Sequence, residues 1–418
     1  MIATAPANVP TLSAPTDEPV AGNYFVAAYP PFSAWDSAQV PALHEALAKP
    51  ALAEPIGLYV HLPFCQKKCD YCYYLSYIAQ PAAVVDRYLD TVLREMELYV
   101  AQPGVKGRPV SFAYFGGGTP STLSSAQVHR LGDGLRRALA WDSIEEVTFE
   151  CAPRSVRREF LESLREMGVT RVSMGVQSFD NELLKLNGRV HLAEDVSRAY
   201  SLIREANFGC VNLDLMCGLM GETEEKWRES VRRVIELGPD SVTIYQTEIP
   251  HNTQLYRDLT AGALPAPPAS WDIKRARLDE GFRELERAGY TVVSAYNAVK
   301  DPQRHRFLYQ DYLWRGATCS GWAWRRSAIL AAFMHRTKTP WSNTKPPWSG
   351  ATCQSSARAS SRITTSSCAS SSSSSNLAKS PSRHSANGSA WTSRTNLPDR
   401  YARSLRKAGS HFPTKRCE

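Results

Sequence analysis

The strongest constraint on the fold is a regular alternation between short apolar runs and amphipathic stretches, which begins at residue 56. The apolar runs, rich in β-branched and aromatic residues, are Leu58–Leu62, Val110–Phe115, Glu146–Cys151, Arg171–Phe179, Val211–Met216 and Ser241–Ile249. Such an alternation with short connections predicts parallel strands with helices outside. Six units favour an α/β fold built as an open or partial (βα)6 barrel over a flat doubly wound sheet.

The stretches between these runs have the helical period. Val84–Tyr99 places one apolar face along Val84, Tyr88, Val92, Met96 and Tyr99. Val156–Met167 is followed by Gly168, a residue typical of helix C-termini. After the sixth unit we expect a helix at about 271–288 and a seventh extended run, Tyr290–Tyr296. In a barrel of this kind, functional groups lie at the C-terminal ends of the strands.

A motif of three cysteines, Cys65, Cys69 and Cys72, directly follows the first strand. Thiolates at this spacing can bind three corners of a [4Fe-4S] cluster and leave one iron without a protein ligand, whereas electron-carrying clusters usually have four cysteines. An open iron indicates catalysis, as an open position on zinc does. Zinc is the weaker alternative because no further Cys or His follows at finger spacing, and His61 precedes the motif on a strand.

Glycines and isolated polar residues fall at the ends of the next strands. Gly116–Pro120 ends the second strand, where glycines allow the backbone to approach a ligand. Glu150, Gln177 and Asp214 are single polar residues inside or ending the third, fourth and fifth strands. A lone carboxylate is more often a helix cap, but buried carboxylates on successive strands need partners. They could hold an ammonium group and ribose hydroxyls.

The formal net charge of +8 is unevenly distributed. Residues 316–418 hold 16 Lys and Arg against two acids, and residues 1–315 hold 33 basic against 39 acidic residues. The main body therefore has no basic patch for a polyanion, and we expect no nucleic-acid partner. No apolar run reaches the roughly 18 residues of a membrane span, and no secretory leader is seen, so we expect a cytoplasmic protein without a membrane partner.

These motifs together resemble the oxygen-independent coproporphyrinogen III oxidase family, a radical S-adenosylmethionine (SAM) group that also includes the heme chaperone HemW. The resemblance covers about residues 23–315. It is carried by Tyr59-Val-His-Leu-Pro-Phe-Cys65, Gly116-Gly-Gly-Thr-Pro120, Glu150 with Pro153, Met174–Phe179, Asn187-Gly-Arg189 and Asn212–Met216. It implies a partial (βα)6 radical SAM barrel that binds a [4Fe-4S] cluster and one or two SAM molecules. It also implies an electron donor such as flavodoxin or ferredoxin.

The resemblance assigns roles position by position. Cys65, Cys69 and Cys72 would hold the cluster, Tyr71 would lie on the adenine side of SAM, and Tyr59 would line the catalytic site.

The remaining SAM contacts follow from the same resemblance. Gly117, Gly118 and Thr119 would contact SAM through backbone atoms, and Thr247 would offer backbone near the adenine. Glu150 would meet the ammonium, Gln177 and Asp214 the ribose, and Arg189 the SAM carboxylate.

The substrate is the open question. The family reaction decarboxylates porphyrinogen propionates to vinyl groups, and the 58 residues before Tyr59 resemble the N-terminal arm of the oxidases. The oxidases, however, carry a further cysteine where this chain has Tyr74, and a His-Phe-Ala stretch where it has Ala295-Tyr296-Asn297. We expect an enzyme acting on a tetrapyrrole. A HemW-like chaperone that binds heme is the alternative, followed by a methylase or cyclopropanase of the same superfamily.

The patterning stops after Gly316, where the chain becomes rich in Ser, Arg, Thr and Trp. The sequence therefore predicts four parts: a partly disordered N-terminal arm (1–55), a radical SAM core (56–300), the start of a C-terminal domain (301–316) and an unstructured tail (317–418). A natural basic binding tail is one explanation of the last part, but tryptophans and cysteines are unusual in disordered segments. A frameshift near codons 316–317 is the other.

The frameshift hypothesis predicts a specific DNA sequence. Read one base earlier, the codons of Trp322 and Ala323 must encode Gly, and Trp324 followed by a CGN arginine codon must encode Ala. The other junctions permit Asp-Leu-Leu-Gly-Leu-Gly-Val-Ala, which resembles what the family carries after Trp-Arg-Gly. Sequencing the gene should show this frame open beyond codon 317. Early stop codons in that frame would refute the hypothesis.

Overall fold

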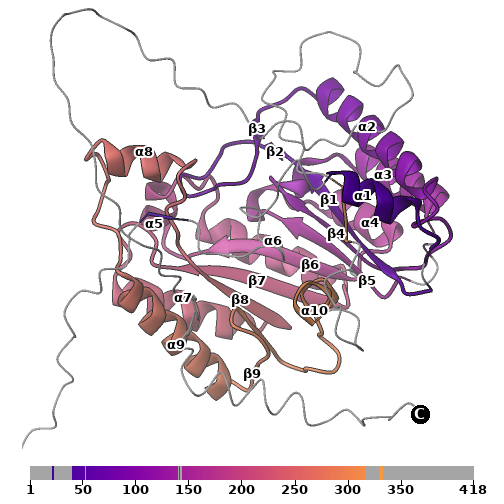
Figure 1. Cartoon of the computed structure of the whole chain (residues 1–418). Coiled ribbons are helices and arrows are strands. Elements are labelled where there is room, and N and C mark those ends of the chain that lie inside the picture. The colour runs from indigo at the N-terminus through magenta and orange to yellow at the C-terminus, as the bar shows by residue number, and fades with distance from the viewer. Residues whose placement is uncertain are drawn as a thin grey trace, which may run out of the picture. The chain divides into compact units, whose positions relative to one another are not determined.

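The computed structural model describes residues 21–22, 40–51, 53–139, 141, 144–315 and 329–332, which all belong to one unit. One large sheet organises them, with the strand order β11-β1-β4-β5-β6-β7-β8-β10-β9 (Figure 1). The sheet is open, because β11 and β9 each lie at an edge. None of the helices in these ranges is long and apolar enough to span a membrane.

The six predicted strands are all present. They are β1 (Ile56–Leu62), β4 (Val110–Gly117), β5 (Glu146–Cys151), β6 (Arg171–Gln177), β7 (Cys210–Cys217) and β8 (Ser241–Gln246). Each pairs in parallel with the next. This confirms the predicted α/β fold with a parallel core. β6 stops before the predicted Phe179 because Gln177 has a φ of 68°, which interrupts the extended backbone.

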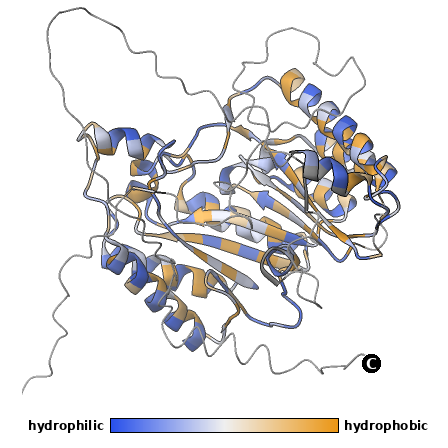
Figure 2. Ribbon diagram, viewed as in Figure 1, coloured by the Kyte–Doolittle hydropathy of each residue, from blue (hydrophilic) through white to orange (hydrophobic). Residues whose placement is uncertain are grey.

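Helices between the strands cover the outer face of the sheet. They are α2 (Ala82–Val100), α3 (Ser125–Ala138), α4 (Arg158–Met167), α6 (Ala193–Glu205), α7 (Glu224–Leu237) and α9 (Trp271–Arg287). Figure 2 shows apolar and hydrophilic residues segregated along them. In α2 the predicted apolar stripe is displaced at its start, where Val85 and Leu89 are buried instead of Val84 and Tyr88. Gly168 ends α4 with a φ of 88°, as expected.

The two faces of the sheet differ in polarity because side chains alternate along each strand. The outer face is apolar, and Val147, Phe149 and Val172 are inaccessible to solvent there. The inner face is largely polar, with Glu146, Thr148, Glu150, Arg171, Ser173, Asn212, Asp214, Ser241, Thr243 and Asn297. The sequence analysis predicts single polar residues in otherwise apolar strands, whereas the structure has a polar face that runs across the strands.

Shorter elements complete the described residues. They are α1 (Val40–Ala48), β2 (Phe64–Cys65), β3 (Tyr77–Ile78), η3 (Pro120–Thr122), η5 (Pro153–Ser155), α5 (Asn181–Leu186), α8 (Gln254–Thr260), β9 (Thr291–Val292), β10 (Asn297–Val299), α10 (Leu308–Arg315) and β11 (Ile329–Ala332). The predicted single run Tyr290–Tyr296 is wrong. In its place β9 and β10 pair antiparallel, and β10 pairs antiparallel with β8.

The predicted tail and N-terminal arm fall mainly outside the described residues. Within 317–418 the structure describes one short strand, β11, which pairs in parallel with β1 and which the sequence did not predict. In the arm, the amide of Gly22 donates to the carbonyl of Ile249, 3.1 Å away, so this point of the arm contacts the core. The aromatic segment at 23–32 is not among the described residues.

One buried asparagine ties together the loops that follow three strands. Asn187 is inaccessible to solvent, and its side-chain amide donates to the carbonyls of Leu183 and Met220 at 2.9 and 3.0 Å. Its side-chain oxygen accepts from the Met220 amide at 3.0 Å. Its backbone carbonyl accepts from the amide of Asp70, in the cysteine loop, at 3.3 Å. The carbonyl of Asp70 in turn accepts from the amide of Leu255 at 3.0 Å.

We predict that Asn187→Ala lowers the free energy of unfolding by about 2–4 kcal/mol, because it leaves buried backbone groups of Met220 unpaired. Urea unfolding measures the change. Asn181→Ala is the matched control: Asn181 is less buried and its side-chain oxygen accepts one backbone amide, from Ala193. It should cost no more than about 1 kcal/mol. Equal losses in the two variants would contradict the bridging role of Asn187.

Candidate functional site

The three cysteines of the motif lie in one loop at the C-terminal end of β1. Cys65 ends the short strand β2, and the amide of Cys72 donates to the carbonyl of Cys69 at 3.1 Å, which closes a turn. All three are free cysteines, and each residue is partly buried. Burial raises the pKa of Cys65, and raises that of Cys72 to about 11. Metal binding would offset this cost, because a bound metal stabilises the thiolate form.

The described residues contain no group of three His, Cys, Asp or Glu side chains that converge on a single metal ion. Both ring nitrogens of His61 are already engaged, Nδ1 with the Tyr59 hydroxyl at 3.2 Å and Nε2 with the Leu75 carbonyl at 3.4 Å. A [4Fe-4S] cubane binds each cysteine through a different iron, so its ligands need not converge on one point.

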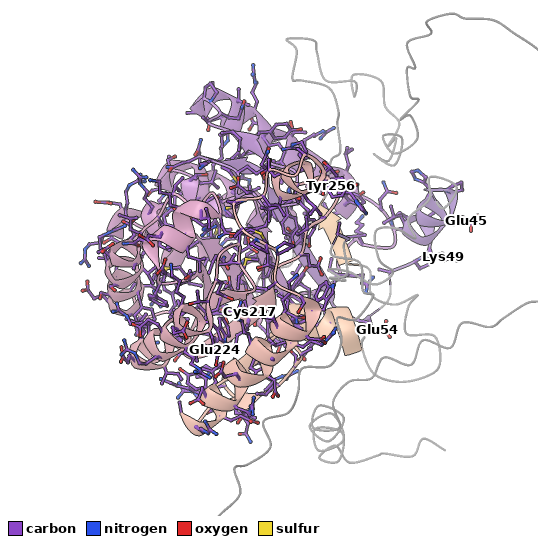
Figure 3. All side chains as sticks on the ribbon, turned by 90° about the vertical axis from the view of Figure 1, so that its left-hand side faces the viewer. Glu45, Lys49, Glu54, Cys217, Glu224 and Tyr256 are labelled. Atoms are coloured by element: carbon purple, nitrogen blue, oxygen red, sulfur yellow. The ribbon has the colours of Figure 1, made fainter. Side chains whose placement is uncertain are left out.

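The remaining described cysteines, Cys151, Cys210 and Cys217, are buried. Cys151 and Cys217 lie in strands, and Figure 3 labels Cys217 among packed side chains. The thiol of Cys210 accepts a hydrogen bond from Arg171 at 3.1 Å. None of the three lies in the cysteine loop, so all three are suitable controls for the motif cysteines.

The glycine-rich end of β4 packs directly under the cysteine loop. A side chain at Gly118 would come within 2.8 Å of the Phe64 backbone, so only glycine fits there. The amides of Gly117, Gly118 and Thr119 donate to Glu150, the Leu62 carbonyl and the Phe64 carbonyl, respectively. The Thr119 carbonyl accepts from the amide and the hydroxyl of Thr122, so the carbonyl oxygens of Gly117 and Gly118 are the groups that the segment can offer a ligand. Such oxygens suit an ammonium group.

Two carboxylates project into the inner side of the sheet without a cationic partner among the described residues. Glu150 accepts from the Tyr114 hydroxyl at 2.6 Å and from the Gly117 amide at 3.1 Å. Asp214 accepts from the Asn212 side-chain amide at 2.7 Å. Burial raises the pKa of Glu150, and burial together with the charge of Glu150 raises the pKa of Asp214 to about 7. A cationic ligand would relieve both effects.

Three buried polar groups near these carboxylates and the cysteine loop lack a hydrogen-bond partner. They are the Tyr71 hydroxyl, Gln177 Oε1 and Arg189 Nε. Arg189 also donates to the Cys69 sulfur at 3.3 Å and to the Gly175 carbonyl at 2.6 Å. Unpaired buried polar groups are rare in native proteins and commonly mark a ligand site. A ligand with an ammonium, a carboxylate and hydroxyl groups fits this set.

Two predicted site residues have their polar atoms engaged by the protein. The amide and hydroxyl of Thr247 both donate to the Cys217 carbonyl, at 2.9 and 3.1 Å. Its own carbonyl is the group left to offer, as the resemblance implied. Tyr59 stacks on Tyr114 with a ring-centroid distance of 5.7 Å. Burial, and then the charge of Glu150, raise the pKa of Tyr59 well above its ordinary value.

The sequence reasoning missed two residues of this site. Tyr114 could have been found from the alternation along β4, which places it on the inner face two residues after Phe112. Tyr309 had no sequence signal, because it follows the last β–α unit and reaches the site only through the tertiary fold.

Comparison with known proteins agrees with this geometry. Residues 59–234 match the Radical SAM superfamily. The chain is 34% identical over 272 residues to the heme chaperone HemW of Escherichia coli, covering 64% of this chain and 70% of that protein. It is also 34% identical over 274 residues to the oxygen-independent coproporphyrinogen III oxidase of the same organism, covering 64% of this chain and 58% of the oxidase. The chain thus spans less than two thirds of the oxidase's length.

A solved structure from this family has a similar fold. Coproporphyrinogen III oxidase (HemN) from Escherichia coli, described as a radical SAM enzyme, superposes with a TM-score of 0.58 and 29% sequence identity. The match covers 68% of this chain and 63% of that structure.

The raised pKa of Asp214 predicts how stability depends on pH. The folded carboxyl keeps its proton up to about pH 7, whereas the unfolded one releases it near its ordinary value of 3.8. The free energy of unfolding of the ligand-free protein should therefore fall as the pH rises through this window, by at most about 1.4 kcal/mol per pH unit. Asp214→Asn should flatten the fall, as measured by urea unfolding between pH 5 and 8.

Asp133→Asn provides the control, since Asp133 is an exposed carboxylate on α3. It should leave the pH dependence of the parent protein in place. An Asp214→Asn variant with the parent's slope would mean that this carboxyl titrates normally in the folded state.

Proposed function

The chain belongs to the radical SAM family of HemW and the oxygen-independent coproporphyrinogen III oxidases, whose chemistry uses a [4Fe-4S] cluster and SAM. From that premise we propose that it is an oxidoreductase acting on a porphyrinogen, and that it converts propionate side chains to vinyl groups by oxidative decarboxylation. One observation carries the enzymatic part of the proposal. Unpaired buried polar groups and uncompensated carboxylates meet beside three free cysteines at one end of the sheet.

The residues divide into two sets by the ligand they suit. Cys65, Cys69 and Cys72 would bind the cluster. The Arg189 guanidinium, with one nitrogen unpaired and another on the Cys69 sulfur, suits the SAM carboxylate next to that cluster.

The amino group and the nucleoside of SAM would meet the other groups. Glu150 and the carbonyls of Gly117 and Gly118 suit its ammonium. Asp214 and Gln177 lie on neighbouring strands and suit ribose hydroxyls. Tyr71 packs against Leu183, Met216, Leu219, Met220, Ile249 and Leu255, an apolar surface suited to the adenine.

When bound, the cluster supplies one electron that cleaves SAM and generates the hydrogen-abstracting deoxyadenosyl group. A flavodoxin or ferredoxin would be the source of that electron. In the proposed reaction the substrate loses a hydrogen atom from the propionate β-carbon. It then loses CO2 and one further electron, which goes to a one-electron acceptor, and a vinyl group remains. The protein orients the substrate and excludes water from the inner side of the sheet.

A second function is a heme chaperone like HemW. The chain covers 70% of the Escherichia coli HemW but 58% of the oxidase at the same identity, which favours this alternative. The two functions differ in chemistry: the oxidase reaction consumes SAM when porphyrinogen is present, and a chaperone retains heme.

We predict that the full-length protein, reconstituted anaerobically with iron and sulfide, forms 5′-deoxyadenosine and vinyl product when coproporphyrinogen III and a reductant are added. Cys69→Ala should lose the bound iron and the 5′-deoxyadenosine, because one corner of the cluster loses its ligand. Cys151→Ala removes a buried cysteine outside the motif and should keep both. Iron analysis and chromatography measure the two quantities.

The outcomes separate the alternatives. Heme retained through purification without deoxyadenosine formation would establish the chaperone function and reject the oxidase. Deoxyadenosine that forms without any change in the porphyrinogen would reject the substrate and keep the radical chemistry. Equal iron content in Cys69→Ala and the parent protein would refute the cluster site itself.

A further inference from the structure

Four aromatic side chains from separate parts of the chain meet on the inner face of the sheet. Tyr59 lies on β1, Tyr114 on β4, and Phe307 and Tyr309 at the start of α10; we call these four residues the inner aromatic cluster. Tyr114 and Tyr309 are stacked with ring centroids 4.5 Å apart, and Tyr59 and Tyr309 with centroids 6.1 Å apart. The Phe307 ring lies 6.1 Å from that of Tyr114. Figure 1 shows α10 in front of the sheet.

The inner aromatic cluster borders the proposed cofactor site directly. The hydroxyl of Tyr114 donates to Glu150 at 2.6 Å, and the hydroxyl of Tyr59 lies 3.2 Å from Nδ1 of His61. The rings therefore lie beside Glu150, the residue that we assign to the ammonium group of SAM. A substrate held against them would be adjacent to the reacting end of the site.

Two buried charged residues fix the segment that carries Tyr309. The Glu146 carboxylate accepts from the Leu308 amide at 3.2 Å. The Arg171 guanidinium lies 4.5 Å from the centre of the Phe307 ring and donates to the Arg306 carbonyl at 3.4 Å. Glu146 and Arg171 are 6% and 2% exposed, so this anchoring is buried on the inner face of the sheet. The ring of Tyr309 is thus held in place on the sheet.

The inner aromatic cluster is more accessible to solvent than the apolar core. Phe115 and Phe149, on the outer face, are fully buried, whereas all four rings of the inner cluster are partly exposed. Packing alone does not require aromatic rings to stay exposed beside carboxylates, and exposed apolar surface of this kind commonly marks a binding site. Rings stacked nearly parallel offer a flat surface that suits another flat ring.

We infer that the inner aromatic cluster binds a pyrrole ring of the tetrapyrrole, with Tyr309 as a specificity-determining residue. The inference rests on the proposed function and deepens it. Tyr309 lies beyond residues 59–234, the part that matches the Radical SAM superfamily. It is therefore placed to select the substrate without taking part in binding the iron–sulfur cluster. The same surface suits a porphyrinogen and heme, since both contain pyrrole rings.

The test is the affinity of the reconstituted full-length chain for two probes, coproporphyrin III and heme, measured by fluorescence quenching and absorbance titration. Tyr309→Ala removes the stacking ring and should raise the Kd about 5- to 20-fold for at least one probe. Tyr309→Leu, which keeps apolar volume without a flat ring, should show a similar loss. Tyr309→Phe keeps the ring and should bind within about twofold of the parent protein.

Tyr200→Ala is the matched control, because Tyr200 is 7% exposed and lies on α6 in the outer helical layer. It should lower the melting temperature and leave both Kd values unchanged. A drop in melting temperature without a change in Kd for Tyr309→Ala and Tyr309→Leu would overturn the inference, since a purely structural ring would behave in that way.

The probes and the deoxyadenosine assay distinguish the possible failures. If the parent protein binds a probe and the Tyr309 variants bind it equally well, the inference fails and the proposed function stands. If the parent binds neither probe but still forms deoxyadenosine, the tetrapyrrole assignment fails and the inference fails with it. Loss limited to coproporphyrin III supports the oxidase, and loss limited to heme supports the chaperone.

Discussion

The rest of the structure depends on a parallel sheet whose two faces have opposite polarity. Helices remove the outer face from water, so Val147, Phe149 and Val172 are apolar and fully buried there. The inner face is not covered in this way and can carry Glu150 and Asp214. Because parallel strands place their carboxyl ends at one edge, these side chains, the glycine-rich end of β4 and the cysteine loop lie together.

In the ligand-free site the backbone is held in place by hydrogen bonds, but several buried polar groups lack partners. Backbone hydrogen bonds fix the cysteine loop from below, through Phe64 and Thr119, and from the side, through Asp70 and Asn187. The polar groups that face the loop remain unpaired, and the pKa of Asp214 is raised to about 7. Such a site costs stability that a bound cofactor returns, because a ligand that binds only the folded state stabilises it. Preorganisation and incomplete pairing both favour tight binding of a charged ligand.

The groups that we propose for the cofactor and the ring that we propose for the substrate belong to different parts of the chain. The cysteines, Glu150, Gln177, Arg189 and Asp214 lie within residues 59–234, which match the Radical SAM superfamily, and Thr247 follows shortly after them. Tyr309 comes from α10, after the last β–α unit, and is positioned by Glu146 and Arg171 at the other end of the strands. This arrangement allows the late segment to vary with substrate while the chemistry of the core is kept, in line with the use of one fold for many functions.

The sequence by itself determined the six parallel strands, the helices between them and the three-cysteine loop, because periodicity and motif spacing are local properties of the chain. It also selected Glu150, Gln177 and Asp214, since strand order places successive strand ends side by side. Only the tertiary structure decided the hairpin of β9 and β10, the pairing of β11 with β1 and the arrival of Tyr309 on Tyr114. The contacts of β11 and Tyr309 join residues far apart in the chain, and β10 of the hairpin pairs with the distant β8, so no local pattern encodes the packing that brings them together.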